Sequence, residues 1–285
     1  MLKLGFIGAG TIGSALALKL SRRGYPVIAV SSRHHTSARK LAQAISGCLP
    51  VTTGQEVADT AELVFITTPD DVIAYVAAQV KWHEGQMVVH CSGADSTGIL
   101  EPARKAGAYV GVFHPIQTFA DAEQAMESMP GSTFTLEAEA PLLGILQEIA
   151  STLGGRWIKI KAGDRAVYHA AAVIVCNYLV TLVKMATDLW QTFGVPRKEA
   201  TEALLPLIRG TVHNLETIGL PQCLTGPIAR GDSGTIKKHL EALERVSPDT
   251  LSSYRELGLK TIPIALSKGR ISERQAEELK AALER

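Results

Sequence analysis

The chain has 285 residues, of which 46% are hydrophobic and 20% charged, so it is long enough for two domains and for a large core. This composition excludes an intrinsically disordered protein. The formal net charge of +1 gives no global reason to expect nucleic acid or an acidic membrane as a partner.

Positive charge is concentrated near the N-terminus. The first 55 residues contain seven Lys and Arg side chains and no Asp or Glu, and the first acid is Glu56. A positive potential over this half-domain suits a small polyanionic ligand.

The cysteines Cys48, Cys91, Cys176 and Cys223 are scattered and form no C-x-x-C pair. We therefore expect neither a metal site nor a disulfide framework. Reduced thiols, together with an N-terminus that runs straight into a strand without a leader, favour a cytoplasmic protein.

The first half of the chain alternates short apolar runs with helical patterns. Predicted strands cover Leu2–Ile7, Val27–Ser31, Leu63–Thr67, Met87–Cys91, Tyr109–Phe113, Thr133–Leu136 and Arg156–Ile160. Predicted helices cover Ile12–Arg23, Ser37–Ile45, Asp71–Val80, Ile99–Ala106 and Pro141–Leu153. This alternation predicts an α/β domain with a mostly parallel sheet and right-handed crossovers.

After Lys161 the pattern is helical only. Predicted helices cover Arg165–Phe193 and Arg197–Ile218, followed by others near Gly234–Arg245, Pro248–Ser267 and Ser272–Arg285. We therefore predict a Rossmann-like domain over residues 1–161 and an all-helical domain over residues 162–285.

The segment Ala166–Val183 carries no charge and is long enough to suggest a membrane span. It contains His169 and Asn177, however, and it is bracketed by Arg165 and Lys184. A buried helix in a soluble helical domain is therefore the prediction, with no membrane as partner.

A glycine-rich turn follows the first strand, where Gly8, Gly10, Thr11, Ile12 and Gly13 form the pattern G-x-G-x-x-G. The first glycine allows the tight turn, the second lets a pyrophosphate approach the backbone, and the third lets the helix pack on the strand. The position between a strand and a helix predicts dinucleotide binding, and a tight turn without a ligand is the alternative.

The second strand ends in Ser31, Ser32 and Arg33, where an NAD site normally has an acid that binds the ribose hydroxyls. Hydroxyl groups and a guanidinium favour a 2′-phosphate instead. We therefore predict NADP(H) as the cofactor. In the alternative interpretation Arg33 only begins a solvated helix.

Two further strand ends are expected to border the cofactor. Thr67, Thr68 and Pro69 stand at the end of one strand, and Ser92 stands at the end of the next, which should reach the nicotinamide side. Asp70 has an alternative role as the N-cap of the helix that follows.

His114 stands at the predicted end of a strand, near the expected nicotinamide position, where it could act as a general acid or base. A loop histidine bonded to backbone is the alternative. On the long helix, His169 and Asn177 can face one cleft, and their partners are either substrate or neighbouring helices.

The loop LTGPIARGD contains the polar residues Thr225, Arg230 and Asp232, for which substrate contact and loop capping are both open.

Six segments together resemble a known family: GFIGAGTIGSALA, TTPDD, HCSGA, FHPIQTF, YHAAAVIVCNYLV and LTGPIARGD. They are similar to Rossmann-like candidate NADP oxidoreductases whose C-terminal domain is catalogued as a domain of unknown function. More distantly, the plan resembles pyrroline-5-carboxylate reductase, prephenate dehydrogenase, ketopantoate reductase and the β-hydroxyacid dehydrogenases. The resemblance implies a helical second domain like that of 6-phosphogluconate dehydrogenase, which often dimerises, and an active site between the domains.

His114-Pro115 is similar to the His-Pro element of prephenate dehydrogenases, in which the histidine is catalytic. The β-hydroxyacid dehydrogenases instead use a Lys followed four residues later by Asn, and here Val173 follows His169 at that spacing. This departure argues against transferring their mechanism.

The resulting hypothesis is an NADP(H)-dependent oxidoreductase that moves hydride to or from a small carbonyl or imine metabolite. His114 would be the proton donor, and His169 and Asn177 would orient the substrate. A homodimer through the helical domain is expected, without nucleic acid. The alternatives are a non-catalytic NADP(H)-binding sensor or scaffold and a purely structural helical dimer.

Overall fold

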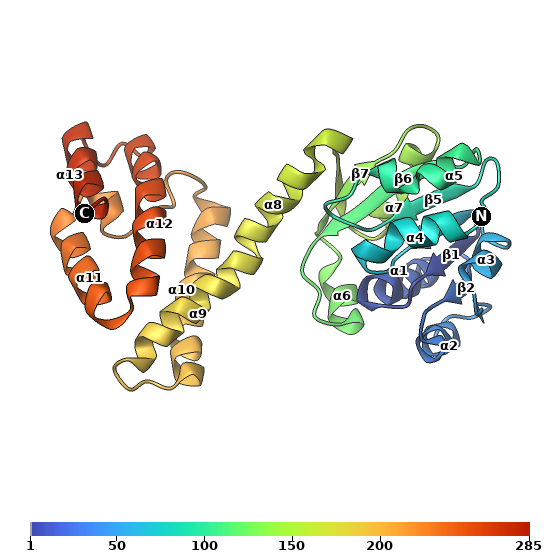
Figure 1. Cartoon of the computed structure of the whole chain (residues 1–285), viewed down its shortest axis with the longest axis horizontal. Coiled ribbons are helices and arrows are strands. Elements are labelled where there is room, and N and C mark those ends of the chain that lie inside the picture. The colour runs from blue at the N-terminus through green and yellow to red at the C-terminus, as the bar shows by residue number, and fades with distance from the viewer. Residues whose placement is uncertain (1) are drawn as a thin grey trace. The chain divides into compact units, whose positions relative to one another are not determined.

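A computed structural model describes residues 2–285 and shows two compact units, Met1–Cys176 and Asn177–Arg285. Figure 1 shows a sheet with flanking helices in the first unit and helices in the second. The division between the units falls within the uncharged helical segment, later than the predicted boundary after residue 161. That boundary stays a prediction.

The first unit is built on one eight-stranded sheet with the order β3-β2-β1-β4-β5-β6-β7-β8. The strands are β1 (Leu4–Ile7), β2 (Val27–Ser31), β3 (Leu49–Pro50), β4 (Leu63–Ile66), β5 (Met87–His90), β6 (Tyr109–Ile116), β7 (Thr133–Glu137) and β8 (Arg156–Lys159). All neighbours are parallel except β6 and β7, which are antiparallel. The predicted mostly parallel sheet is thus confirmed.

Helices cover both faces of this sheet. They are α1 (Thr11–Arg22), α2 (His35–Gln43), α3 (Gly54–Ala58), α4 (Asp70–Gln79), α5 (Glu101–Lys105), α6 (Ala122–Ser128) and α7 (Leu142–Thr152), with the 3-10 turn η1 (Thr97–Leu100). The 3-10 turn η2 (Ala162–Asp164) and helix α8 (Arg165–Val175) follow the last strand, and α8 runs away from the sheet (Figure 1). One core joins the sheet to α1, α2, α6 and α7, and a second joins it to α3, α4 and α5. This doubly wound arrangement is typical of Rossmann-like domains.

Three short elements were not predicted from the sequence: β3, α3 and α6. β3 has two residues, and α3 has five and depends on a capping box between Thr53 and Glu56. Segments this short contain too few residues to show a period.

The predicted end of the strand at Phe113 is wrong, because β6 continues to Ile116. Its first half pairs with β5, where His90 lies beside Val112, and its second half pairs with β7, where His114 lies beside Thr135. The antiparallel partner β7 supplies the hydrogen bonds that β5 no longer provides, so His114 is held in a strand and not in a loop.

The second unit contains α9 (Asn177–Gln191), α10 (Arg197–Thr217), the 3-10 turn η3 (Ile228–Arg230), α11 (Ser233–Val246), α12 (Pro248–Ser267) and α13 (Glu273–Leu283). Its core joins α11, α12 and α13 through Ile236, Ile262 and Leu279, among others. The predicted single helix over 165–193 is divided into α8 and α9 by one residue, Cys176, with φ −106° and ψ −68°.

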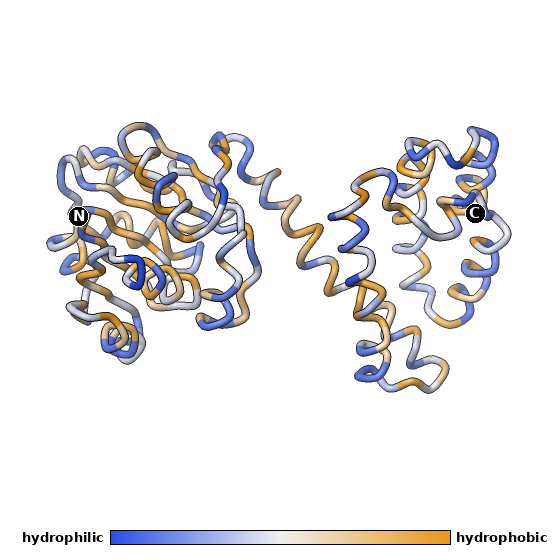
Figure 2. The backbone as a smooth tube through the Cα atoms, turned by 180° about the vertical axis from the view of Figure 1, so that it is seen from behind, coloured by the Kyte–Doolittle hydropathy of each residue, from blue (hydrophilic) through white to orange (hydrophobic). Residues whose placement is uncertain are grey.

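The uncharged helical segment is not buried, contrary to the prediction. The helical stretch Ala162–Gln191 is long and apolar enough to cross a membrane. Its most apolar window of 18 residues has a mean hydropathy of 1.8, and none of that window is buried. Figure 2 colours much of α8 and α9 in the hydrophobic range. Val167 is 74% exposed and Val180 is 70% exposed, so this apolar surface has no cover within the described chain.

Candidate active site

The glycine turn after β1 is locked by Thr67, the residue that follows β4. Gly8 has φ +120°, and a Cβ there would lie 2.6 Å from the Thr67 carbonyl carbon. A Cβ on Gly13 would lie 2.4 Å from Thr67 Oγ1, which itself donates to the Gly8 carbonyl at 2.8 Å. Glycine is therefore required at both positions, and the Thr67 hydroxyl holds the turn closed.

Gly10 differs from its neighbours because its missing side chain faces open space, with no atom within 4 Å of a Cβ built there. It is the N-cap of α1, with φ −81°; within the described chain no side chain caps this helix, and its first turn has no acid. Thr11 and Ile12, both half-buried, begin the helix. Uncapped N–H groups beside an open approach suit a phosphate.

Solvent exposure increases along the three residues at the end of β2. Ser31 is only 3% exposed, Ser32 is half-buried and Arg33 is exposed. The following helix begins at His35 with His34 as its N-cap, so Arg33 precedes the helix and does not begin it. Over residues 2–285, no ion pair involves Arg33. Its guanidinium is therefore available to a ligand at this strand end.

The turn after β4 shows that Asp70 does not act as an N-cap. Pro69 is the N-cap of α4, and Asp70 is the first helical residue. The Asp70 carboxylate instead lies 2.8 Å from Ser92 Oγ, which is also 3.0 Å from Asp95 Oδ2. The Ser92 hydroxyl is therefore engaged by the protein, whereas Thr68 Oγ1 is buried without a partner.

Beyond β5, two predicted histidines converge on a glycine. A Cβ on Gly93 would lie 2.5 Å from His169 Cδ2 and 2.9 Å from His114 Nε2. The two imidazole rings are 6.1 Å apart at their centroids and nearly perpendicular. His114 Nδ1 faces the other way and lies 2.7 Å from the Tyr168 hydroxyl. Only glycine fits between the imidazoles, so both histidines border the position of Gly93.

A buried ion pair lies behind this cluster. Arg165, the first residue of α8, has no exposed surface, and its Nε lies 3.8 Å from Glu137 Oε2. One Arg165 amino group donates to the Ser92 carbonyl at 3.0 Å. The other oxygen of Glu137 accepts from the backbone and hydroxyl of Thr97. This ion pair ties α8 to β7 and to the turn after β5.

The surroundings of His114 keep its imidazole neutral at pH 7. Burial, and to a smaller extent the nearby Arg165, His169 and His90, lower the pKa of His114 to about 4. A protonated imidazole is therefore not populated near neutral pH. His114 can therefore donate a proton only as a neutral ring that gives up its single N–H. In this form its role as proton donor stays a prediction.

His90 is fully buried behind the same turn. Its Nδ1 accepts from the Ser92 backbone N–H at 3.2 Å, so its proton lies on Nε2, which is 3.2 Å from the Ser96 carbonyl. Burial lowers the pKa of His90 to about 4. His90 is a structural residue that fixes the shape of the turn.

Three predicted residues belong to the second unit. Asn177 begins α9, Thr225 is exposed, and Arg230 is the exposed last residue of η3. In the same loop Asp232 caps α11 by accepting from the Thr235 backbone at 2.9 Å. Loop capping thus explains Asp232, and substrate contact for the other three stays a prediction.

Sequence reasoning missed Tyr168, Arg165 and Glu137. Tyr168 is adjacent to His169 in the segment YHAAAV, which is a signal that could have suggested it. Arg165 was noted only as the charge at one end of an apolar stretch. Its pairing with Glu137 crosses from a helix to a strand, and no spacing in the sequence indicates such a contact.

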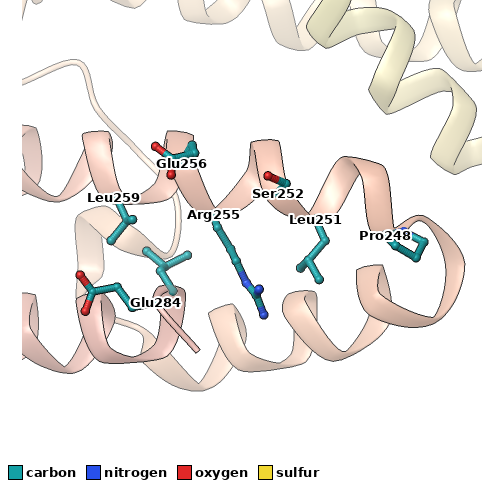
Figure 3. A pocket seen from close by; sticks show the side chains of 8 residues that line it. Pro248, Leu251, Ser252, Arg255, Glu256, Leu259 and Glu284 are labelled. Carbon is teal, nitrogen blue, oxygen red and sulfur yellow. The ribbon is translucent and has the colours of Figure 1, made fainter.

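The larger cavities described lie outside this cluster. One of about 600 Å³ in the first unit is bordered by Thr97, Arg104, Glu137 and Lys159, among others. Another of about 370 Å³ in the second unit contains Arg255, which extends from α12 between Leu251 and Leu259 (Figure 3). Neither is lined by a predicted site residue. Within residues 2–285 no group of three or more His, Cys, Asp and Glu is placed to hold a metal ion.

Family models match both halves of the chain. Residues 1–115 match the Rossmann-like domain, and residues 132–261 match the domain of unknown function DUF2520. The chain combines a Rossmann-like domain with a DUF2520 domain. No curated protein matches it.

Solved structures share this fold over nearly the whole chain. A Thermotoga maritima protein is 28% identical with a TM-score of 0.78, covering 94% of this chain and 100% of its own. A candidate NADP oxidoreductase from Bacteroides fragilis is 27% identical with a TM-score of 0.72, covering 92% and 98%. A reductive aminase from Aspergillus terreus in complex with NADPH and ethyl-5-oxohexanoate is 17% identical with a TM-score of 0.64, covering 100% and 93%. Pyrroline-5-carboxylate reductases share the fold at 15–18% identity.

Proposed function

We propose that this chain is an NADP(H)-dependent oxidoreductase acting on the carbonyl or imine group of a small metabolite. The observation that carries the proposal is the convergence of His114 and His169 on Gly93. This point lies at the carboxyl ends of the parallel strands, the edge at which the glycine turn opens α1. Ligands of open α/β sheets bind at this edge.

The residues of the glycine turn fit a dinucleotide. The open space at Gly10 and the uncapped N-terminus of α1 suit the pyrophosphate, and Ser32 and Arg33 suit a 2′-phosphate. When bound, a dihydronicotinamide would supply the hydride that reduces the substrate carbon. The NADPH complex of the reductive aminase with a keto ester, on the same fold, supports a carbonyl or imine substrate class.

In this proposal His114 exchanges the proton at the substrate oxygen or nitrogen. Its Nε2 faces Gly93, and the His169 ring borders the same point. A neutral imidazole can give its one N–H proton to a heteroatom that becomes basic as the carbon is reduced. Asn177, Thr225 and Arg230 are proposed substrate contacts.

Gly10→Ala tests the cofactor part of the proposal. With φ −81° and no atom within 4 Å, an alanine should fold without strain. Its methyl group should nevertheless occupy the approach to α1, so we expect NADPH binding by calorimetry to weaken by at least tenfold at an unchanged melting temperature. Gly144→Ala, also free of contacts and within α7, is the matched control. Equal NADPH affinity in both variants would contradict the cofactor assignment.

His114→Asn tests the catalytic part. We expect NADPH to be consumed with at least one member of a panel of aldehydes and ketones, each with and without added amine. In His114→Asn, turnover should fall by roughly 10²–10⁴ while NADPH affinity is kept. A protein that binds NADPH but consumes none with any panel member would instead be a dinucleotide-binding sensor or scaffold.

We further propose that the protein is a cytoplasmic homodimer assembled through its helical domain. The exposed apolar residues Leu179, Val180 and Leu182 on α9 and Leu205 and Leu207 on α10 support this. An apolar surface of this kind marks an interaction site in a soluble protein.

A further inference from the structure

Tyr168 contacts the proposed catalytic histidine directly. Its hydroxyl oxygen lies 2.7 Å from His114 Nδ1, a distance typical of a strong hydrogen bond. The two rings meet edge to face, with centroids 5.9 Å apart and an interplanar angle of 78°. This contact is made by the nitrogen that faces away from Gly93, so Tyr168 and the proposed substrate position lie on opposite sides of the imidazole.

The position of Tyr168 is fixed by buried charge. The Arg165 guanidinium carbon lies 5.9 Å from the centre of the Tyr168 ring and one turn earlier in α8. Arg165 is itself held by the Ser92 carbonyl and by Glu137. The tyrosine therefore stands on a braced helix beside a cation that would stabilise a phenolate.

With both groups uncharged, the hydrogen bond can run in either direction, and its direction decides the tautomer of His114. Burial raises the pKa of Tyr168, while the Thr135 hydroxyl and Arg165 pull it downward, and the phenol stays protonated at pH 7. His114 is neutral, with His90, His169 and Arg165 as its charged or titratable neighbours. A neutral imidazole has one N–H, and an Nδ1 that accepts from Tyr168 leaves this proton on Nε2, toward Gly93.

We propose that Tyr168 is the positioning residue of His114: its hydroxyl donates to Nδ1, holds the imidazole as the Nε2–H tautomer, and replaces the proton that Nε2 gives to substrate. The contact stands on the geometry, and its donor direction, with the tautomer that follows, is part of the proposal. The proton replacement rests in addition on the proposed function. No residue of the second unit is needed for either part.

The proton transfer balances without a further reactant beyond the dihydronicotinamide. As the substrate carbon gains hydride, its π bond to oxygen or nitrogen breaks, and the heteroatom takes the Nε2 proton. The Tyr168 hydroxyl proton moves to Nδ1, so His114 stays neutral. The negative charge passes to the Tyr168 oxygen beside Arg165. After the product leaves, Nε2 takes a proton from solvent and the Nδ1 proton returns to the phenolate, which restores the starting tautomer.

Nitrogen-15 NMR of the full-length protein tests the tautomer without any substrate. We expect the His114 ring of the wild-type protein to carry its proton on Nε2, with Nδ1 unprotonated. In Tyr168→Phe the fixed tautomer should be lost and Nδ1–H should become populated. Tyr75→Phe, which removes a hydroxyl from a side chain that is 65% exposed, should leave the His114 signals unchanged.

An Nδ1–H tautomer in the wild-type protein would overturn the proposal, even if Tyr168→Phe fails to fold. An Nε2–H tautomer that persists unchanged in Tyr168→Phe would overturn it as well. With a panel substrate, Tyr168→Phe should lower kcat on the order of 10² with little change in KM and should alter the pH profile of kcat. If NMR shows the fixed Nε2–H tautomer but the protein consumes no NADPH with any panel member, the contact between Tyr168 and His114 is kept and the proposed function is contradicted.

Discussion

His114 and His90 are two imidazoles that the fold keeps uncharged, and this has a consequence for stability. Each has a pKa of about 4 in the folded protein, against 6.5 without the fold. Between these values the unfolded chain binds protons that the native chain does not. The free energy of unfolding is therefore fully present above pH 6.5 and falls as the pH drops toward 4.

We predict that this loss is at most about 1.4 kcal/mol per pH unit for each histidine. Urea unfolding at several pH values measures it. His90→Gln should reduce the slope between pH 6.5 and 4, and His213→Gln, at an exposed histidine, should not. An equal slope in His90→Gln and the wild-type protein would show that His90 titrates normally in the fold.

The roles of single residues could be predicted from the sequence where they depend on local pattern. The glycine turn, the basic end of β2 and the position of His114 near the carboxyl edge follow from strand and helix order. The neutrality of His114 could not be predicted, because it depends on burial and on Arg165 and His169, which are distant from it in the chain. The same holds for the engagement of Ser92 by Asp70.

Helix α8 is joined to the sheet by Arg165 as well as by Tyr168 and His169, which contact His114. Two Arg165 nitrogens and one Glu137 oxygen are buried without hydrogen-bond partners. Such a pair contributes little net stability compared with an apolar pair, but removing one partner leaves a buried charge.

Arg165→Met should therefore lower the free energy of unfolding by about 3–5 kcal/mol at pH 7. The double variant Arg165→Met with Glu137→Gln should recover part of the lost stability, because the unpaired buried charge of Glu137 is then removed. Arg156→Met, at an exposed arginine of β8, is the control. Chemical denaturation checks this order, and a loss below about 1 kcal/mol in Arg165→Met would mean that the ion pair does not anchor α8.

The long elements were predicted from sequence because periodicity and glycine or proline boundaries defined them. Strand β2 and helix α12 have the predicted bounds. The break at Cys176 was not predicted, since the apolar pattern continues through it on both sides. The antiparallel β7 was not predicted either, because direction in a sheet is set by tertiary pairing.

For the whole molecule, the exposed apolar segment is the feature that the isolated chain does not explain. If a second copy covers it, light scattering after gel filtration should give the mass of a dimer. Val180→Glu with Leu207→Glu should then yield a monomer, because both side chains are largely exposed in the single chain. Lys260→Glu on α12 is the control. A monomeric wild-type protein would contradict the proposed dimer.

The central claim for the whole molecule is that its first unit binds NADP(H) through Arg33 at the end of β2. Isothermal titration calorimetry of NADPH and NADH, with the wild-type protein, Arg33→Ala and Arg22→Ala, tests it most directly. We predict that the wild-type protein binds NADPH at least tenfold more tightly than NADH. Arg33→Ala should remove that preference, and Arg22→Ala should keep it. Equal or tighter binding of NADH by the wild-type protein would contradict the account.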